Sequence, residues 1–102
     1  MIYHITSKAD WEDAVINGNY HCGTLHEEGY IHASEDHQVE GVLQRYFSGR
    51  HDLVKLVIDP GLLRSQIVHE WSPSIQDTFP HIYGPINVDA VVKVETCSLP
   101  QN

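Results

Sequence analysis

Several short stretches of the chain are hydrophobic at every second position or throughout, which is typical of β-strands with a buried face. This pattern predicts strands at residues 2–6, 30–33, 53–58, 67–71 and 90–94. The polar run Asp59-Pro60-Gly61 predicts a turn directly after the third of them. Residues 20–25 fit either a loop or a short strand, and 26–29 form a polar patch typical of a turn.

Two stretches have the spacing of helices instead. Ser7 is a favourable N-cap for the first helix, and Gly18 can end it in the left-handed conformation. Ser34 is expected to cap the second helix, which would stop at Ser48-Gly49. Its hydrophobic residues recur at helical spacing and are Val39, Val42, Leu43, Tyr46 and Phe47.

Helices thus come early and strands dominate later, an order that favours an α+β fold with a mostly antiparallel sheet. The 102 residues are the length of one ordinary domain, which we place at residues 1–102. A chain of this size buries roughly two-thirds of its unfolded surface, so it can form a core without disulfides or bound metals. Residues 98–102 are expected to fray.

The net charge of the chain limits the classes of partner that it can bind. The formal net charge is −8, from 14 acidic and 6 basic residues. The basic residues are scattered, whereas a protein that binds duplex nucleic acid needs a basic patch. We therefore expect no binding to duplex nucleic acid and none to anionic membranes. The oligomeric state is left open.

The two cysteines, Cys22 and Cys97, could pair in an oxidising compartment, and the sequence does not decide whether they meet. The beginning of the chain has no basic region followed by an apolar run, so no signal peptide is expected. No apolar stretch is long enough to span a bilayer. We therefore expect a cytoplasmic protein with two free thiols.

The run Phe79-Pro80-His81-Ile82-Tyr83-Gly84-Pro85-Ile86 is the most informative segment. Prolines fix φ and Gly84 permits a close approach, so the segment is expected to be rigid. His81 and Tyr83 share a face if it is extended. Pro80 and Pro85 each remove a hydrogen-bond donor and favour a sheet edge or a bend. The segment could line a pocket or form a structural corner.

Two other histidines lie in predicted strands. If Tyr3 and Ile5 face the core, His4 faces a cleft or the solvent. His32 and Ser34 lie where a strand runs into a helix, a place where free N–H groups suit an anion. Ordinary structural roles for these residues remain alternatives.

A metal site is a weaker possibility. His26, His32 and His37, with Glu27 or Asp36, are candidate ligands. A zinc site needs three or four converging ligands, and none of these residues has a helical His-x3-His or a Cys-x2-Cys spacing. We therefore expect no metal.

Together, five blocks resemble the bacterial family catalogued as domain of unknown function 952. The blocks are Ile2-Tyr3-His4-Ile5-Thr6, Asp10-Trp11, Gly29-Tyr30-Ile31-His32-Ala33-Ser34, Val57-Ile58-Asp59-Pro60 and Phe79 to Ile86. The resemblance spans nearly the whole chain and keeps the order of the blocks. It implies an ADP-ribosyltransferase-like fold, a split, mostly antiparallel sheet, here with two N-terminal helices.

The resemblance also implies a cleft for a nicotinamide nucleotide. By position, His4 matches the first motif of the superfamily, Tyr30, His32 and Ser34 match the second, and His81 falls near the third. The third motif normally supplies a glutamate that stabilises an oxocarbenium-like transition state. This sequence has none there, and the nearest acids, Glu70 and Asp77, do not match the motif.

Two main hypotheses for function follow. The first is a diverged ADP-ribosyltransferase-fold enzyme acting on NAD or a related small-molecule nucleotide. Its catalytic residues would be His4, His32 and His81, and its binding residues Tyr30, Ser34 and Tyr83. The second is a non-catalytic module with the same nucleotide-binding cleft. A less favoured third is a two-histidine phosphoesterase, because His4-Ile5-Thr6 and His32-Ala33-Ser34 are two His-x-Ser/Thr units.

Overall fold

The structure is a computed structural model that describes residues 1–97. Its helices are α1 (Lys8–Asn17), α2 (Gly23–Glu28) and α3 (Val39–Tyr46), with the short 3-10 helices η1 (Asp36–Gln38) and η2 (Val88–Ala90). Its strands are β1 (Ile2–Ser7), β2 (Asn19–Tyr20), β3 (Ile31–His32), β4 (Leu53–Ile58), β5 (Gln66–Ser72), β6 (Asp77–Tyr83), β7 (Ile86–Asn87) and β8 (Val91–Thr96). The fraying expected at 98–102 lies outside the described residues.

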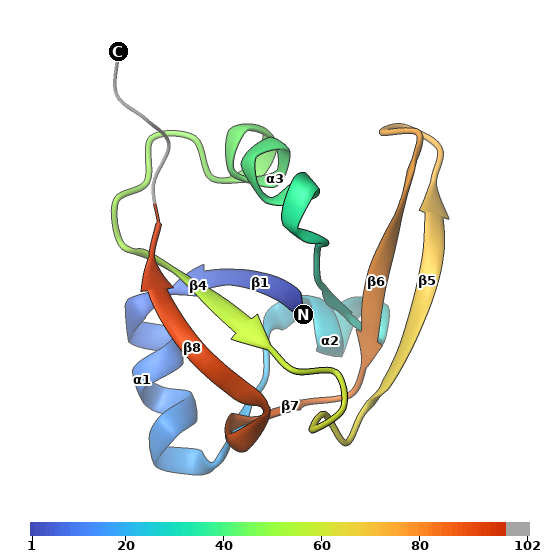
Figure 1. The fold of residues 1–102 in the computed structure, drawn as a ribbon. Helices are drawn as coiled ribbons and strands as arrows, with labels where there is room; N and C mark the ends of the chain where they lie inside the picture. Colours follow the sequence, from blue (N-terminus) through green and yellow to red (C-terminus); the bar gives the residue numbers. More distant parts are fainter. Residues whose placement is uncertain (98–102) are drawn as a thin grey trace.

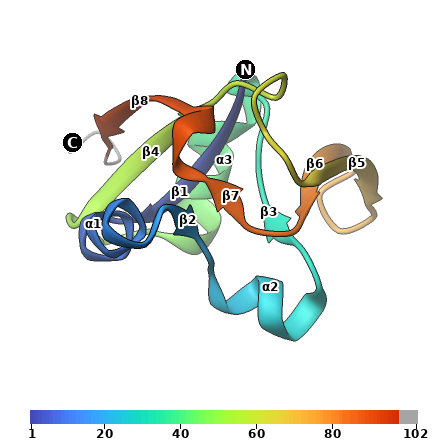
Figure 2. The same ribbon diagram turned by 90° about the horizontal axis from the view of Figure 1, so that it is seen from below.

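The strands form two three-stranded sheets and one small pair (Figure 1). Their orders are β1-β4-β8, β3-β6-β5 and β2-β7. Every strand pair within residues 1–97 is antiparallel, which confirms an α+β fold with antiparallel sheets. Figure 2 shows the β2-β7 pair lying between the two larger sheets. A backbone bridge between Tyr3 and Ser34 also joins β1 to the segment that follows β3.

The first helix is set by its caps, as the sequence predicts. The side chain of Ser7 accepts a hydrogen bond from the Asp10 backbone N–H at 3.1 Å. Gly18 ends α1 with φ of 86°, and its N–H bonds to the carbonyl of Ala14. That left-handed conformation is open to glycine at no steric cost.

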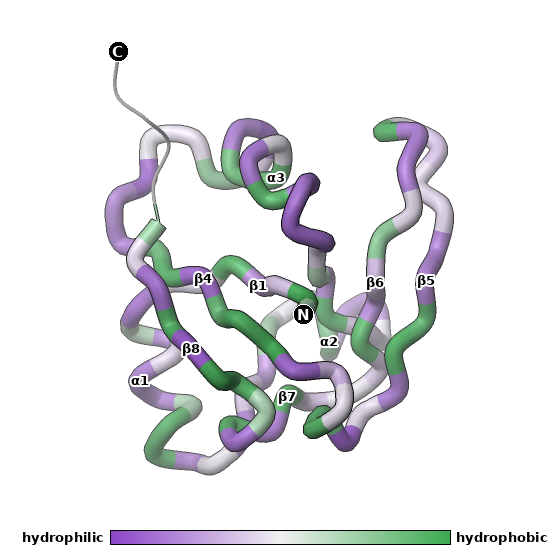
Figure 3. The backbone as a smooth tube through the Cα atoms, in the orientation of Figure 1, coloured by the Kyte–Doolittle hydropathy of each residue, from purple (hydrophilic) through white to green (hydrophobic). Residues whose placement is uncertain are grey.

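Both faces of sheet β1-β4-β8 are covered, which makes β1 a core strand. Ala14 of α1 packs on one face with Ile2 and Leu56. Leu43 of α3 packs on the other face with Ile5. Figure 3 shows that most of β4 is hydrophobic, whereas the η1 segment is hydrophilic. The polar residues in the middle of β1, His4 and Thr6, are therefore buried rather than open to solvent.

Two local predictions are wrong. Ser34 does not cap a helix, because its backbone is already paired with Tyr3. The cap is Glu35, in a reciprocal capping box with Gln38 at the start of η1. Residues 23–28 form α2 rather than a turn-like patch, and Gly29 ends it with φ of 86°. The first 46 residues thus contain three α-helices, where two were expected.

The segment around Pro80 is a central strand rather than an edge or a bend. β6 pairs with β5 on one side and with β3 on the other. The carbonyl of Pro80 accepts a bond from Ala33 at 3.0 Å, so the absent N–H falls on the side of β3, just beyond that strand's end at His32. Gly84 has φ of 152°, and any Cβ there would collide with the Ser65 side chain, which confirms the close approach.

No helix within residues 1–97 is long and apolar enough to cross a membrane.

Both cysteines are free thiols in the structure. Cys22 packs against the core on the α1 side of the sheet, and Cys97 against the core on the α3 side. The two thiols therefore belong to different parts of the core.

Candidate functional site

Four aromatic or imidazole rings lie together on one face of sheet β3-β6-β5, opposite to the buried Ile31 and Ile82. They are Tyr30, His32, His81 and Tyr83, which we call the ring cluster. Strand pairing explains the gathering, since His32 lies directly opposite His81 and Tyr83 follows two residues later on the same face. The sequence predicted that His81 and Tyr83 share a face, and the structure adds the other two rings.

Tyr30 lies at the middle of the ring cluster. Its ring stacks on His81 with centroids 4.1 Å apart and an interplanar angle of 15°. It also contacts His32 edge-on at 5.0 Å and Tyr83 at 5.3 Å. The rings of His32 and His81 lie 5.3 Å apart. The cluster is therefore one packed group of rings rather than separate surface residues.

Two carboxylates hold the ring cluster by hydrogen bonds. Oε1 of Glu70, in β5, accepts a bond from Nδ1 of His81 at 2.9 Å and another from the Tyr83 hydroxyl. Oε1 of Glu28, at the end of α2, lies 3.3 Å from Nε2 of His32. None of these six residues is a lysine or arginine. The site is therefore acidic and aromatic.

These contacts fix the ionisation of the site. The Tyr83 hydroxyl and then His81 lower the pKa of Glu70, because both donate to its charged form. Glu70 in turn raises the pKa of Tyr83 to about 12. The pKa of Glu28 is lowered by hydrogen bonds from His32 and Tyr30. Both carboxylates are therefore charged at neutral pH, and Tyr83 keeps its proton.

The pairing with Glu70 also sets the proton on His81. A carboxylate only accepts hydrogen bonds, so Nδ1 of His81 is the donor. In the neutral ring Nε2 then carries the lone pair. His81 is oriented by an acid in the same way as the histidine of a catalytic base–acid pair. Such an imidazole can take a proton from a hydroxyl or a water.

His4 lies outside the ring cluster, in the core. Its side chain is 8% exposed. Nδ1 donates to the backbone carbonyl of His32 at 2.6 Å, and Nε2 lies 2.9 Å from the hydroxyl of Tyr20. The expectation that His4 faces a cleft or solvent is wrong, because α1 covers that face of β1. A catalytic role for His4 stays a prediction, and both of its ring nitrogens already have partners.

Burial also decides the charge of His4. Desolvation lowers its pKa to about 4, so the ring is neutral at pH 7 and carries one proton. The carbonyl of His32 requires that proton at Nδ1, which leaves Nε2 to accept from Tyr20. The Tyr20 hydroxyl also bonds with the Thr6 hydroxyl at 2.9 Å. The same burial raises the pKa of Tyr20 above its ordinary range.

The two His-x-Ser/Thr units do not share one open surface. In the first, His4 and Thr6 are buried and bonded to Tyr20. In the second, His32 is half exposed, but Ser34 is buried at 5% exposure. The structure thus brings the backbone of His32 to His4 while keeping their rings in different environments.

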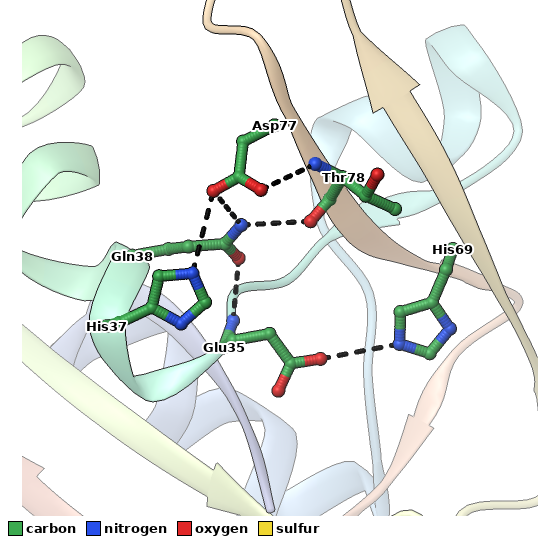
Figure 4. A network of polar contacts seen from close by, with 6 residues as sticks. All are labelled: Glu35, His37, Gln38, His69, Asp77 and Thr78. Atoms are coloured by element: carbon green, nitrogen blue, oxygen red, sulfur yellow. Dashed lines mark hydrogen bonds and ion pairs between the residues drawn. The ribbon is translucent and has the colours of Figure 1, made fainter.

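A second polar network joins η1 to the β5-β6 hairpin (Figure 4). The buried Gln38 amide donates to Asp77 at 2.7 Å and to the carbonyl of Thr78 at 2.9 Å. His69 lies 3.3 Å from Glu35 on the opposite face of β5 from Glu70. These contacts tie η1 to the β5-β6 hairpin.

The remaining candidate features do not add to the site. A hollow lies between α1 and residues 19–23, away from every member of the ring cluster. Within residues 1–97, no group of three or more histidine, cysteine, aspartate or glutamate residues is placed to hold a metal ion.

Glu70 is the residue that sequence reasoning missed. In the sequence it is only an acid near the third motif that does not match it. The signal was present in the hairpin pattern, because two strands joined across residues 73–76 place Glu70 opposite Phe79. Its side chain then shares a face with His81 and Tyr83. Exact register, which the sequence left open, was needed to see this.

Comparison with known proteins places the chain among its relatives. The model of a family described as "Protein of unknown function (DUF952)" matches residues 5–94. The chain belongs to this family. No curated protein matches it.

Solved structures agree with the fold. The crystal structure of protein CC0527 from Caulobacter crescentus has a TM-score of 0.87 at 29% identity, over 97% of this chain and 87% of that chain. A crystal structure of its double mutant has the same TM-score at 28% identity and the same coverage. The solution structure of CC0527 has a TM-score of 0.78 at 29% identity, over 97% and 85% of the two chains. The DUF952 fold of the present chain is therefore similar to that of a bacterial protein.

Proposed function

We propose that this DUF952 protein is a diverged enzyme of the ADP-ribosyltransferase type, which binds NAD or a related nucleotide at the ring cluster. The observation that carries the proposal is the His81–Glu70 pair, in which Nδ1 of His81 lies 2.9 Å from Oε1 of Glu70. The same oxygen accepts a bond from the Tyr83 hydroxyl. A glutamate is the residue that the third motif lacks in sequence. Glu70 reaches the same neighbourhood from the adjacent strand, so it can take over that role.

The charge of the site favours the nicotinamide end of such a nucleotide. The nicotinamide ring of NAD is a cation, and aromatic faces and carboxylates both attract cations. Glu28 and Glu70 are ionised, and the ring cluster has no lysine or arginine to hold a phosphate. NAD is therefore a better candidate than a phosphorylated RNA end. Tyr30 would need to swing off His81 to admit a second ring.

The chemistry follows from the same groups. The bond between C1′ of the ribose and the nicotinamide nitrogen breaks, and its electron pair neutralises the pyridinium ring. Glu70 stabilises the positive charge that develops on the ribose. Nε2 of His81 takes the proton of the attacking water or acceptor hydroxyl as the new bond to C1′ forms. The products with water are ADP-ribose, nicotinamide and one proton.

Binding without turnover is a second candidate, and one observation favours it. The Tyr30 ring already stacks on His81 at 4.1 Å, so the face of the imidazole is occupied in this conformation. A nucleobase that replaced Tyr30 in this stack would be bound by stacking alone, with no bond broken. A cytoplasmic location suits both candidates, since NAD is available there.

The first experiment is an NMR titration with NAD, followed by an assay for released nicotinamide. The test variants are Glu70→Gln and His81→Ala, and the matched control is His69→Ala. His69 lies in the same hairpin and pairs with a glutamate at 3.3 Å, but on the other face. We expect Glu70→Gln to slow nicotinamide release by about 10²-fold and the control to leave it unchanged.

The outcomes separate the candidates. Shifts at residues 30–34 and 81–83 with nicotinamide release support the enzyme. The same shifts with intact NAD support the binding module. No shift at the ring cluster at millimolar NAD overturns both, and turnover that is equal in Glu70→Gln and wild type overturns the assigned mechanism.

A further inference from the structure

Strand β8 is an open edge of sheet β1-β4-β8. Within residues 1–97 it pairs with β4 on one side and with no strand on the other. Two of its valines are unusually exposed, Val92 at 52% and Val94 at 40%. Figure 1 shows β8 at the outside of its sheet, opposite to β1. An exposed edge strand with hydrophobic side chains is a template for pairing with another chain.

The hydrogen bonds to β4 show which backbone groups of β8 are free. The N–H of Cys97 bonds to the carbonyl of Leu53 at 3.2 Å, so the backbone polar groups of residue 97 point toward β4. In an antiparallel pair the backbone N–H and C=O groups of alternate residues point to the same side, so those of Glu95 and Lys93 also point toward β4. The N–H and C=O groups of Val94 and Thr96 therefore point outward. These groups are available to a second strand.

We propose that β8 pairs with β8 of a second copy of this chain, antiparallel across a two-fold axis at Val94. In this register Val94 exchanges two backbone hydrogen bonds with Val94 of the second copy. Lys93 then lies opposite Glu95 of the second copy, and Glu95 opposite its Lys93. The two sheets join into one six-stranded sheet, and each copy contributes the same surface.

Charge selects this register over its neighbours. A shift that places the axis at Lys93 brings two lysines face to face, and an axis at Glu95 brings two glutamates together. Like charges directly opposite each other destabilise a strand pair, whereas opposite charges stabilise it. Glu95 already lies 3.9 Å from Lys55, so these side chains share one face of the sheet. Only the axis at Val94 pairs every charge with its opposite.

A bulge shortens the part of β8 that can pair, and this makes the dimer weak. The pairing of β4 with β8 shifts register between Val57 and Ile58, which leaves Val92 as an extra residue in a bulge. Bulges end strand pairing and protect sheet edges. The ladder is therefore confined to the second half of β8, and such a small interface gives a transient dimer.

Sedimentation velocity of the full chain across a roughly hundredfold range of concentration tests the proposal. We expect the mean mass to rise with concentration and association to weaken in high salt. Lys93→Glu and Glu95→Lys are each expected to weaken association by about tenfold or more, since each creates two like-charge pairs. Lys93 is exposed, whereas Glu95 is half-buried and lies 3.9 Å from Lys55 within its own copy. Thermal unfolding of each variant therefore checks that the fold is kept.

The decisive measurement mixes the two variants. A Lys93→Glu chain carries two acids at these positions and a Glu95→Lys chain carries two bases, so the mixed pair has two attractive contacts. We expect the mixture to associate at least as well as the wild type. A wild type that stays monomeric overturns the proposal. Association unchanged in the single variants, or not restored on mixing, overturns it as well.

Discussion

His4 and His81 are both strand histidines with a hydrogen bond at Nδ1, and they differ in what surrounds them. His4 is buried between a backbone carbonyl and the Tyr20 hydroxyl. His81 pairs with the ionised Glu70 on a face that also carries the exposed Tyr83. Burial keeps the ring of His4 uncharged, whereas the ring of His81 lies against a charged carboxylate.

The comparison teaches that a histidine in a strand acquires its role from its neighbours. A ring with both nitrogens bonded inside the core has no atom left for a ligand. A ring oriented by a carboxylate, with its second nitrogen free to accept, can move a proton. Substituting His4 should therefore mainly cost stability, whereas substituting His81 should mainly cost activity.

The largest expected effect separates the two histidines by stability. His4→Ala should lower the free energy of unfolding by about 4 kcal/mol, because it leaves buried polar partners unpaired and opens a cavity. His81→Ala should cost about 1 kcal/mol, because its partners remain in contact with water. Urea unfolding at pH 7 measures both values. Similar losses in the two variants would contradict the structural role of His4.

The next effect concerns pH. The folded pKa of His4, about 4, lies below its ordinary value of 6.5, so the unfolded chain binds the proton more readily between these values. Stability should therefore be unaffected above pH 6.5 and fall by about 3 kcal/mol as the pH drops to 4. The lowered pKa values of Glu28 and Glu70 add losses only below their ordinary value of 4.5.

Unfolding curves at several pH values check this window. His4→Asn keeps a donor for the His32 carbonyl but has no titrating ring, so its stability should be flat from pH 6.5 to about 5. His81→Ala is the control that should retain the wild-type slope. A wild-type stability that does not change between pH 6.5 and 4.5 would show that His4 is not desolvated.

The smallest expected effect is the difference between two tyrosines. Tyr20 bonds to His4, and Tyr83 bonds to Glu70, the partner of His81. Tyr20→Phe should cost about 2 kcal/mol, because Nε2 of His4 and the Thr6 hydroxyl lose their buried partner. Tyr83→Phe should cost less than about 0.5 kcal/mol, since Tyr83 is 39% exposed and water replaces its hydroxyl. Thermal unfolding of the pair measures the difference. Equal costs would mean that burial does not distinguish the two hydroxyls.

Local features of the fold were predictable from the sequence. Ser7 and Gly18 bound the first helix through caps that need only neighbouring residues. The hydrophobic spacing of Val39 and Leu43 marked α3, and the continuous run at 53–58 marked β4. The helix at 23–28 escaped detection because it has no side-chain cap and no buried residue. Its formation depends on the chain around it.

The sequence by itself thus determined the α+β order of elements, the family and the shared face of His81 and Tyr83. Each of these follows from contacts or periodicities within a few residues along the chain. Only the tertiary structure decided that His4 is buried and that Glu70 reaches His81. The first depends on α1 folding back over β1, and the second on the register of two strands across a hairpin. Both are distances between segments, which alternation along one strand does not specify.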